Sequence, residues 1–294
     1  MLSVLKQNVC IKGTLEECPT GESDYDPTVR PWYVAASSGP KDIILVLDTS
    51  GSMQTADRIG IMREAAKRVI NTLGVSDYFA VVEFDTTAKY VSGSTLQRAT
   101  AENKNTVLRN IDRLDPTGGT NFYNGFDMAF DIFRSSEIVD KTSGCHQAIL
   151  FLTDGMMSDD KDALFSLLNE EVTSFINRGR SPPAMFTYSF GAGADTTVPK
   201  QIACDYNGIW SDVKEGGDLA KSMGGYYKYF ANAGLSEDDF VAWVEPYEYS
   251  TTGELGTTAS APVFDRSVDP PIFLGVVGLD FSFAAMERKF DAPS

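Results

Sequence analysis

The sequence predicts an α/β fold: a doubly wound, mostly parallel six-stranded sheet, accompanied by a second small α+β domain formed by the two flanks. Unbroken apolar runs such as Ile43–Leu47 and Ala148–Leu152 are typical of parallel strands that are buried on both faces. These runs alternate with segments of helical spacing such as Arg58–Leu73. Strands that alternate with helices indicate a parallel sheet covered on both sides.

The other elements of the α/β unit follow in the same alternation. Further strands are expected at Phe79–Phe84, Met185–Phe190 and around Ile209, and further helices at Asn105–Leu114, Phe122–Phe133, Asp162–Ile176 and Asp218–Phe230. The helices carry apolar residues three and four positions apart, which is the spacing that buries one helix face. We expect this unit to span residues 41–232.

The two flanks, residues 1–40 and 233–294, have a different pattern. The first is rich in Gly, Pro, Thr and Glu, and the second contains strand-like runs at 240–244, 257–264 and 272–280. Gly and Pro residues separate these runs, which predicts an antiparallel meander. Since neither flank can bury a core alone, we expect them to form one small domain into which the α/β unit is inserted.

Composition excludes several classes of function. The formal net charge of -16 argues against nucleic acid and anionic membrane surfaces as partners. The only histidine, His146, lies at the start of an expected buried strand, so neither a histidine-rich zinc site nor a Ser-His-Asp triad is expected. The start of the chain has no signal-peptide pattern, and no run approaches the roughly 18 apolar residues of a membrane span.

The four cysteines are Cys10, Cys18, Cys145 and Cys204. The last two are expected on the face opposite the carboxyl ends of the strands. A Cys145–Cys204 disulfide, which an extracellular location would permit, and two buried free thiols are both compatible with the sequence.

Polar residues gather in three segments that belong to one edge of the predicted sheet. They are Asp48-Thr49-Ser50-Gly51-Ser52, Thr117-Gly118-Gly119-Thr120-Asn121 and Thr153-Asp154-Gly155. Each alone would be an ordinary turn or helix cap, but ligands of parallel sheets bind at this edge. Two carboxylates and three hydroxyls form an all-oxygen set, which suits Mg²⁺, Mn²⁺ or Ca²⁺. The ion would keep net positive charge and attract an external carboxylate.

Enzymatic interpretations are less well supported. Haloacid-dehalogenase phosphatases also place an Asp after a buried strand, but they need a second Asp two residues later, where this chain has Ser50. No GxxxxGK[ST] or GxGxxG motif follows any strand, so a nucleotide site is not expected. No general base stands out beside the metal ligands. We therefore predict that the protein is not an enzyme, with a metal-dependent hydrolase as the weaker alternative.

The segment Asp48–Ser52, together with Thr120 and Asp154, resembles the metal-ion-dependent adhesion site of von Willebrand factor A-type domains, which have a Rossmann-like sheet. The resemblance implies that Ser50, Ser52 and Thr120 bind the ion directly. It implies that Asp48 and Asp154 bind it directly or through water. It also implies a protein partner that offers an acidic side chain to the ion.

The flanks carry a second resemblance. Tyr25–Ala36, which contains Arg-Pro-Trp-Tyr, resembles the signature of double Cache sensor domains, and Leu274–Asp280 resembles their last strand. A Cache domain interrupted by a von Willebrand A domain is similar to the alpha-2/delta auxiliary subunits of voltage-gated calcium channels and their relatives. This implies an extracellular or cell-surface protein, with a membrane channel or receptor as partner.

Some Cache domains of this type bind a free amino acid. The residues that match are Tyr25, Arg30, Trp32, Tyr33, Tyr247 and Asp280. Arg30 and the indole N–H of Trp32 would hold a carboxylate, Asp280 would hold an ammonium group, and the tyrosines would line the pocket. The alternative is that Arg-Pro-Trp-Tyr only packs the junction between the domains, with Arg30 paired to Asp280 or Asp26.

Overall fold

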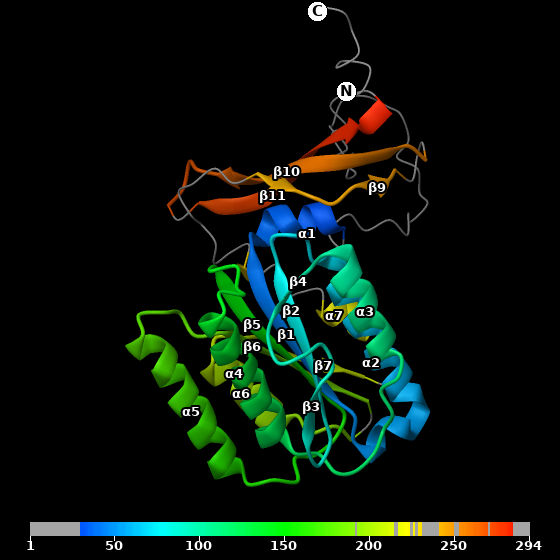
Figure 1. The fold of residues 1–294 in the computed structure, drawn as a ribbon. Helices are drawn as coiled ribbons and strands as arrows, with labels where there is room; N and C mark the ends of the chain where they lie inside the picture. Colours follow the sequence, from blue (N-terminus) through cyan, green and yellow to red (C-terminus); the bar gives the residue numbers. More distant parts are fainter. Residues whose placement is uncertain are drawn as a thin grey trace, which may run out of the picture.

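Two sheets of very different size make up the described part of the protein. The computed structural model describes residues 30–191, 193–214, 217–223, 226, 229–230, 241–249, 253–269 and 271–284. Tyr25, Asp26, Cys10 and Cys18 therefore lie outside the described residues. A short helix, α1 (Pro31–Ser38), lies between the two sheets (Figure 1).

The larger sheet has the strand order β3-β2-β1-β5-β6-β7. Its strands are β1 (Lys41–Asp48), β2 (Tyr78–Phe84), β3 (Ala88–Tyr90), β4 (Gln97–Arg98), β5 (His146–Thr153), β6 (Ala184–Phe190) and β7 (Trp210–Val213). The pairs β1–β2, β1–β5, β5–β6 and β6–β7 are parallel, whereas β3 and β4 pair antiparallel with β2. The mostly parallel sheet is confirmed. Its path holds six strands, and the two-residue β4 adds a seventh.

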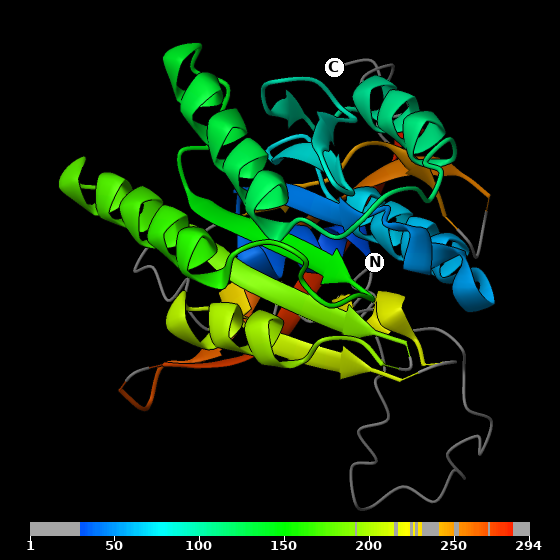
Figure 2. The ribbon, with the colours of Figure 1, turned by 90° about the horizontal axis from the view of Figure 1, so that it is seen from below.

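Helices cover both faces of this sheet. They are the 3-10 segment η2 (Gly51–Asp57) and the helices α2 (Arg58–Thr72), α3 (Ala101–Ile111), α4 (Phe122–Ile138), α5 (Lys161–Asn177), α6 (Thr197–Asp205) and α7 (Leu219–Met223). Ile43, Leu45 and Leu47 of β1 pack with α2, α3 and α7. Ile44 and Val46, which point to the opposite face, pack with α4, α5 and α6. Figure 2 shows the two helical layers, which confirm the doubly wound arrangement.

Aromatic side chains fix α4 to the centre of the sheet. The ring of Phe151 in β5 stacks against Phe84 of β2 at 5.1 Å and against Phe126 of α4 at 4.7 Å. Phe122, at the start of α4, meets the same ring edge-on at 4.8 Å. Such aromatic pairs add to the free energy of burial. The turn that precedes α4 is therefore held against the end of β5.

The smaller sheet is antiparallel and contains β8 (Ala242–Trp243), β9 (Tyr247–Glu248), β10 (Leu255–Asp265) and β11 (Ile272–Ser282). Helix α1, which the sequence did not predict, packs on this sheet. The Ser260 hydroxyl donates to the carbonyl oxygen of Trp32 over 2.8 Å, and a Cβ on Gly278 would lie 3.4 Å from the Trp32 ring. The described parts of the two flanks are thus in contact. The division into domains remains a proposal.

The direction of β1 decides where each edge of the large sheet lies. Lys41, the first residue of β1, follows closely after α1, so the amino ends of the parallel strands face the antiparallel sheet. Their carboxyl ends lie at the far end of the molecule (Figure 1). The predicted metal edge is therefore remote from the smaller sheet.

Two further expectations concern cysteines and membrane segments. The described cysteines, Cys145 and Cys204, are free thiols, and their side chains are exposed rather than buried. Within the residues that the structure describes, no helix has the length and apolar character that crossing a membrane requires.

Candidate metal centre

The five predicted metal ligands come together at the carboxyl edge of the large sheet. Asp48 is the last residue of β1, and Ser50 and Ser52 follow it in the turn that leads into η2. Asp154 comes directly after β5, and Thr120 lies two residues before α4. Because β1 and β5 are parallel neighbours, their carboxyl ends lie side by side.

Asp48 is a fully buried carboxylate with both oxygens hydrogen-bonded. The backbone N–H of Ser50 donates to Oδ1 over 2.8 Å, and the Thr153 hydroxyl donates to Oδ2 over 2.6 Å. Burial raises the pKa of Asp48 to about 6, while the hydrogen bonds from Ser50 and Thr153 act in the opposite direction. Among the described residues, no salt bridge involves Asp48. A buried carboxylate without a cation is costly, and a metal ion would compensate it.

A chain of oxygen atoms runs from this first loop to the third. The hydroxyl oxygens of Ser50 and Ser52 are 3.0 Å apart, and the Ser52 hydroxyl donates to Oδ1 of Asp154 over 2.7 Å. Ser50 and Asp154 are buried, whereas Ser52 is exposed. The group therefore opens to solvent on the side of Ser52, where a ligand from outside could reach it.

Thr120 joins this group through the packing of the second loop. A Cβ placed on Gly155 would lie 3.1 Å from the Thr120 hydroxyl and 3.5 Å from the Ser52 hydroxyl, so both oxygens border the same small space. The Thr120 carbonyl accepts from the N–H and the hydroxyl of Ser158, at 2.9 Å each. Asp159 caps α4 by accepting from the N–H groups of Phe122 and Tyr123.

The first and second loops are also tied by their backbones. The N–H of Gly51 donates to the carbonyl of Gly118 over 3.1 Å, and the N–H of Thr117 donates to the carbonyl of Thr49 over 2.7 Å. Ser52 links the first loop to Asp154 of the third, and Thr120 links the second loop to Ser158, three residues beyond the third. The ligand set is therefore organised by the protein alone.

The donor set fits a small, hard cation. Oxygen ligands of an octahedral ion at about 2.1 Å lie about 3 Å from their neighbours. The oxygen separations of 2.7 and 3.0 Å in the chain from Ser50 to Asp154 match that spacing. In the described part of the chain, no three His, Cys, Asp or Glu side chains form a metal-binding group. The hydroxyls are thus essential to any site at this edge.

Two residues of this centre were not expected from the sequence. Thr153 holds Asp48, and Arg58 donates from Nη1 to Oδ2 of Asp154 over 2.8 Å. Thr153 stands beside a predicted ligand, and a hydroxyl next to an acidic residue could have suggested its role. Arg58 was expected only as the first residue of a helix, and its partner is distant in sequence.

The structure separates the residues predicted to bind an amino acid. Tyr247 and Asp280 lie close together, since the Thr258 hydroxyl is 2.6 Å from the Tyr247 hydroxyl and donates to Asp280 over 2.7 Å. Trp32 lies beneath the same sheet, but Tyr33 packs against the core of the α/β unit instead. Arg30 precedes α1 and is exposed. Among the described candidates, the structure groups Trp32, Tyr247 and Asp280.

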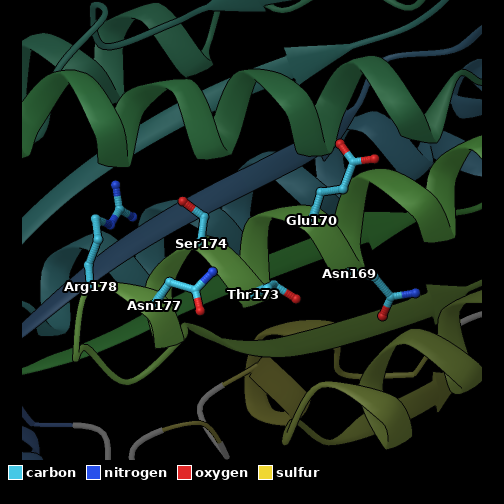
Figure 3. A pocket seen from close by; sticks show the side chains of 6 residues that line it. All are labelled: Asn169, Glu170, Thr173, Ser174, Asn177 and Arg178. Carbon is cyan, nitrogen blue, oxygen red and sulfur yellow. The ribbon is translucent and has the colours of Figure 1, made fainter.

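One surface hollow lies away from all of these residues. It has a volume of about 470 Å³ and is lined by Asn169, Glu170, Thr173, Ser174, Asn177 and Arg178, all on α5 or at its end (Figure 3). Glu170 and Ser174 point to one side of the helix and Asn169 points to the other. None of the residues that line this hollow was predicted to bind a ligand.

Comparison with known proteins identifies the class of domain. The family model of the von Willebrand factor type A domain matches residues 43–156, a range that contains all five predicted ligands. Over these residues the α/β unit matches a domain of this type. A solved structure described as von Willebrand factor type A from Catenulispora acidiphila has the same fold, with a TM-score of 0.54. It is 19% identical, and the match covers 83% of this chain and 55% of that one.

More particularly, the chain is homologous to alpha-2/delta subunits of voltage-dependent calcium channels. It is 28% identical over 271 residues to subunit alpha-2/delta-3 of Rattus norvegicus, covering 87% of this chain and 24% of that protein. It is 28% identical over 275 residues to subunit alpha-2/delta-2 of Homo sapiens, covering 90% of this chain and 23% of that protein. The chain spans about a quarter of the length of these relatives.

Proposed function

We propose that the von Willebrand factor type A domain binds a divalent ion through Asp48, Ser50, Ser52, Thr120 and Asp154, and through that ion an acidic side chain of a protein partner. The observation that carries the proposal is the unbroken chain of oxygens from Ser50 through Ser52 to Asp154, beside the buried Asp48. The spacing of these oxygens favours Mg²⁺ or Mn²⁺ over the larger Ca²⁺.

The charge of the centre supports an acidic partner. Asp48 and Asp154 supply two negative charges, and the guanidinium of Arg58 offsets one of them. A bound divalent ion therefore leaves the group with a net positive charge, close to the exposed Ser52. An external carboxylate would compensate that charge and complete the coordination of the ion.

The first test is metal binding itself. Titration with Mn²⁺, followed by the loss of the free-ion electron paramagnetic resonance signal, should show one site in the wild type and none in Asp48→Ala. Asp205→Ala removes an equal charge from an exposed position on α6 and should bind like the wild type. Equal binding by Asp48→Ala and the wild type would contradict the proposal.

The second test concerns the acidic group. A short peptide with one Glu should bind the Mn²⁺-loaded protein, while the same peptide with Gln should not. Binding of the Glu peptide should disappear in EDTA and in Asp48→Ala. A peptide that binds equally well with and without the ion would rule out metal-mediated recognition.

We further propose that the domain acts in an extracellular or cell-surface protein whose partner is a membrane channel or receptor, without catalytic activity. The homology to calcium channel subunits supports this. A full-length protein that contains the domain should co-purify with its channel in Mg²⁺ and less so in EDTA. A phosphatase and esterase screen with Mn²⁺ should show no turnover.

A second candidate function is binding of a free amino acid at the antiparallel sheet. The hydrogen bonds that link Tyr247, Thr258 and Asp280 favour it, since Thr258 and the Trp32 ring both lie near Gly278, two residues before Asp280. Calorimetry with a panel of amino acids should show heat that disappears in Asp280→Asn. No heat with any member of the panel would count against this function.

A further inference from the structure

Arg58 connects the start of α2 to the metal centre. Its Nη1 donates to Oδ2 of Asp154 over 2.8 Å, and the exposed fractions of the two side chains are 8% and 0%. The other oxygen of Asp154, Oδ1, accepts from Ser52 over 2.7 Å. Asp154 is thus held between a predicted metal ligand and a buried cation.

The position of Arg58 is locally unfavourable. It is the first residue of α2, where the helix dipole favours negative charge, and the first turn contains no acidic residue. The two preceding residues, Ala56 and Asp57, have φ values of 50° and 55°, a conformation that is uncommon for residues other than glycine. Neither the helix dipole nor the backbone conformation before α2 therefore explains why an arginine occupies this position.

The end of β6 leaves room for the guanidinium. Gly191 follows β6 with a φ of +90°, and a Cβ at this position would lie 2.5 Å from Nε and 2.7 Å from Cζ of Arg58. The N–H of Gly191 donates to the carbonyl of Val213 over 3.0 Å, which holds the glycine beside β7. The arginine is therefore enclosed between Gly191 on one side and Asp154 on the other.

This geometry has an electrostatic consequence for metal binding. A divalent ion on Ser50, Ser52 and Asp154 would share the Asp154 carboxylate with the guanidinium, and the two cations would repel each other at short range. We infer that Arg58 competes with the metal ion for the Asp154 carboxylate and so lowers the affinity of the centre for the ion. Tight metal binding then requires an external carboxylate as a further ligand. The inference rests on the proposed metal site.

Mn²⁺ titration of arginine variants tests this role. Arg58→Met removes the charge and should tighten Mn²⁺ binding about tenfold. Arg58→Lys keeps the charge and should stay close to the wild type. Arg68→Met removes an exposed charge further along α2 and should also match the wild type. Equal or weaker binding by Arg58→Met would overturn the inference, because an arginine that only positions Asp154 would weaken binding when lost.

Stability provides an independent measurement. Without Arg58 the buried Asp154 lacks its cation, so Arg58→Met should unfold at a lower temperature in EDTA. Mn²⁺ should then raise its Tm by more than it raises that of the wild type. If Arg58→Met does not fold, Arg58→Gln removes the charge while keeping an N–H donor and should show the same two effects. An equal Mn²⁺-induced rise of Tm in the neutral variant and the wild type would overturn the inference.

The two proposals fail in different ways. If the metal site is wrong, the wild type binds no Mn²⁺ or binds it no better than Asp48→Ala does, and the inference falls with it. If only the inference is wrong, the wild type binds Mn²⁺ and Asp48→Ala does not, but the neutral Arg58 variants bind no more tightly than the wild type.

Discussion

The hydroxyl of Ser52 donates a hydrogen bond of 2.7 Å to Oδ1 of Asp154, although the two residues are 102 positions apart in the sequence. This contact connects the turn that follows β1 with the turn that follows β5. Ser52 is a predicted direct ligand of the ion, and the Asp154 carboxylate that it contacts also accepts from Arg58 of α2. The contact therefore links a predicted metal ligand to the ion pair that connects α2 with the end of β5.

Ser52→Ala should weaken Mn²⁺ binding by at least about tenfold, since the hydroxyl oxygen is lost from the ligand set. It should also lower the free energy of unfolding by about 1 to 2 kcal/mol, because the buried Asp154 carboxylate loses one of its hydrogen-bond donors. Calorimetric titration and urea unfolding measure the two quantities. Ser94→Ala, at another exposed position, should change neither. Unchanged Mn²⁺ affinity in Ser52→Ala would show that this hydroxyl is not a ligand.

The amino-terminal edge of the sheet contains a buried ion pair that the sequence pattern does not predict. The Lys41 ammonium lies 3.1 Å from Oδ1 of Asp77, with exposed fractions of 0% and 3%. Asp77 also accepts from the backbone N–H groups of Lys41 and Gly74. The carboxylate thus connects the start of β1 to the turn before β2.

Lys41→Met should lower the free energy of unfolding by about 3 to 5 kcal/mol, because it leaves the Asp77 carboxylate buried without its cation. The double variant Lys41→Met/Asp77→Asn should recover part of this loss, since the amide is neutral and its single oxygen still accepts from one of the two N–H groups, which Asp77 binds through different oxygens. Urea unfolding of the two variants measures the difference. A double variant that is less stable than the single one would contradict this account.

Phe151→Ala should destabilise the protein by about 3 to 5 kcal/mol, because it opens a cavity between Phe84, Phe122 and Phe126. Phe122 lies only two residues after Thr120, so the loss should also weaken Mn²⁺ binding. The partly buried Phe165 offers a control, and Phe165→Ala should cost less and leave metal affinity unchanged. Equal losses of stability in the two variants would argue against the packing role of Phe151.

The sequence predicted the parallel strands well because each is an apolar run buried on both faces. Every residue of β1, for example, is buried. The strands β3, β4 and β9, with three residues or fewer, are too short to show a periodicity. Helix α1 was missed for a different reason. It is short, and its buried residues, including Trp32 and Ala36, contact elements on both sides rather than one.

The metal ligands could be predicted because parallel strands end at one edge, which brings residues such as Asp48 and Asp154 together without knowledge of any contact. Ion pairs do not follow from such a rule. Arg58 and Asp154 are 96 residues apart, and their contact depends on the space beside Gly191. The direction of Tyr33 was equally hidden, because α1 presents side chains to both the small sheet and the α/β core.

His146 should make the free energy of unfolding depend on pH below 6.5, the ordinary pKa of a histidine side chain. Burial, with the positive charge of Lys41, lowers the pKa of His146 from the ordinary value of 6.5. Its ring stacks on Phe230 with centroids 5.0 Å apart. As the pH falls below 6.5, the unfolded chain binds a proton that the folded protein does not, so the free energy of unfolding decreases.

Urea unfolding at about pH 7.5 and about pH 5.5 should therefore show a loss of stability that is smaller in His146→Gln. Since the chain has a single histidine, no other imidazole contributes to the difference between the two proteins. Carboxylates contribute equally to both and cancel in the comparison. A His146→Gln protein that loses as much stability as the wild type would show that this ring titrates with its ordinary pKa in the folded state. A greater loss in His146→Gln would indicate that folding raises the pKa instead.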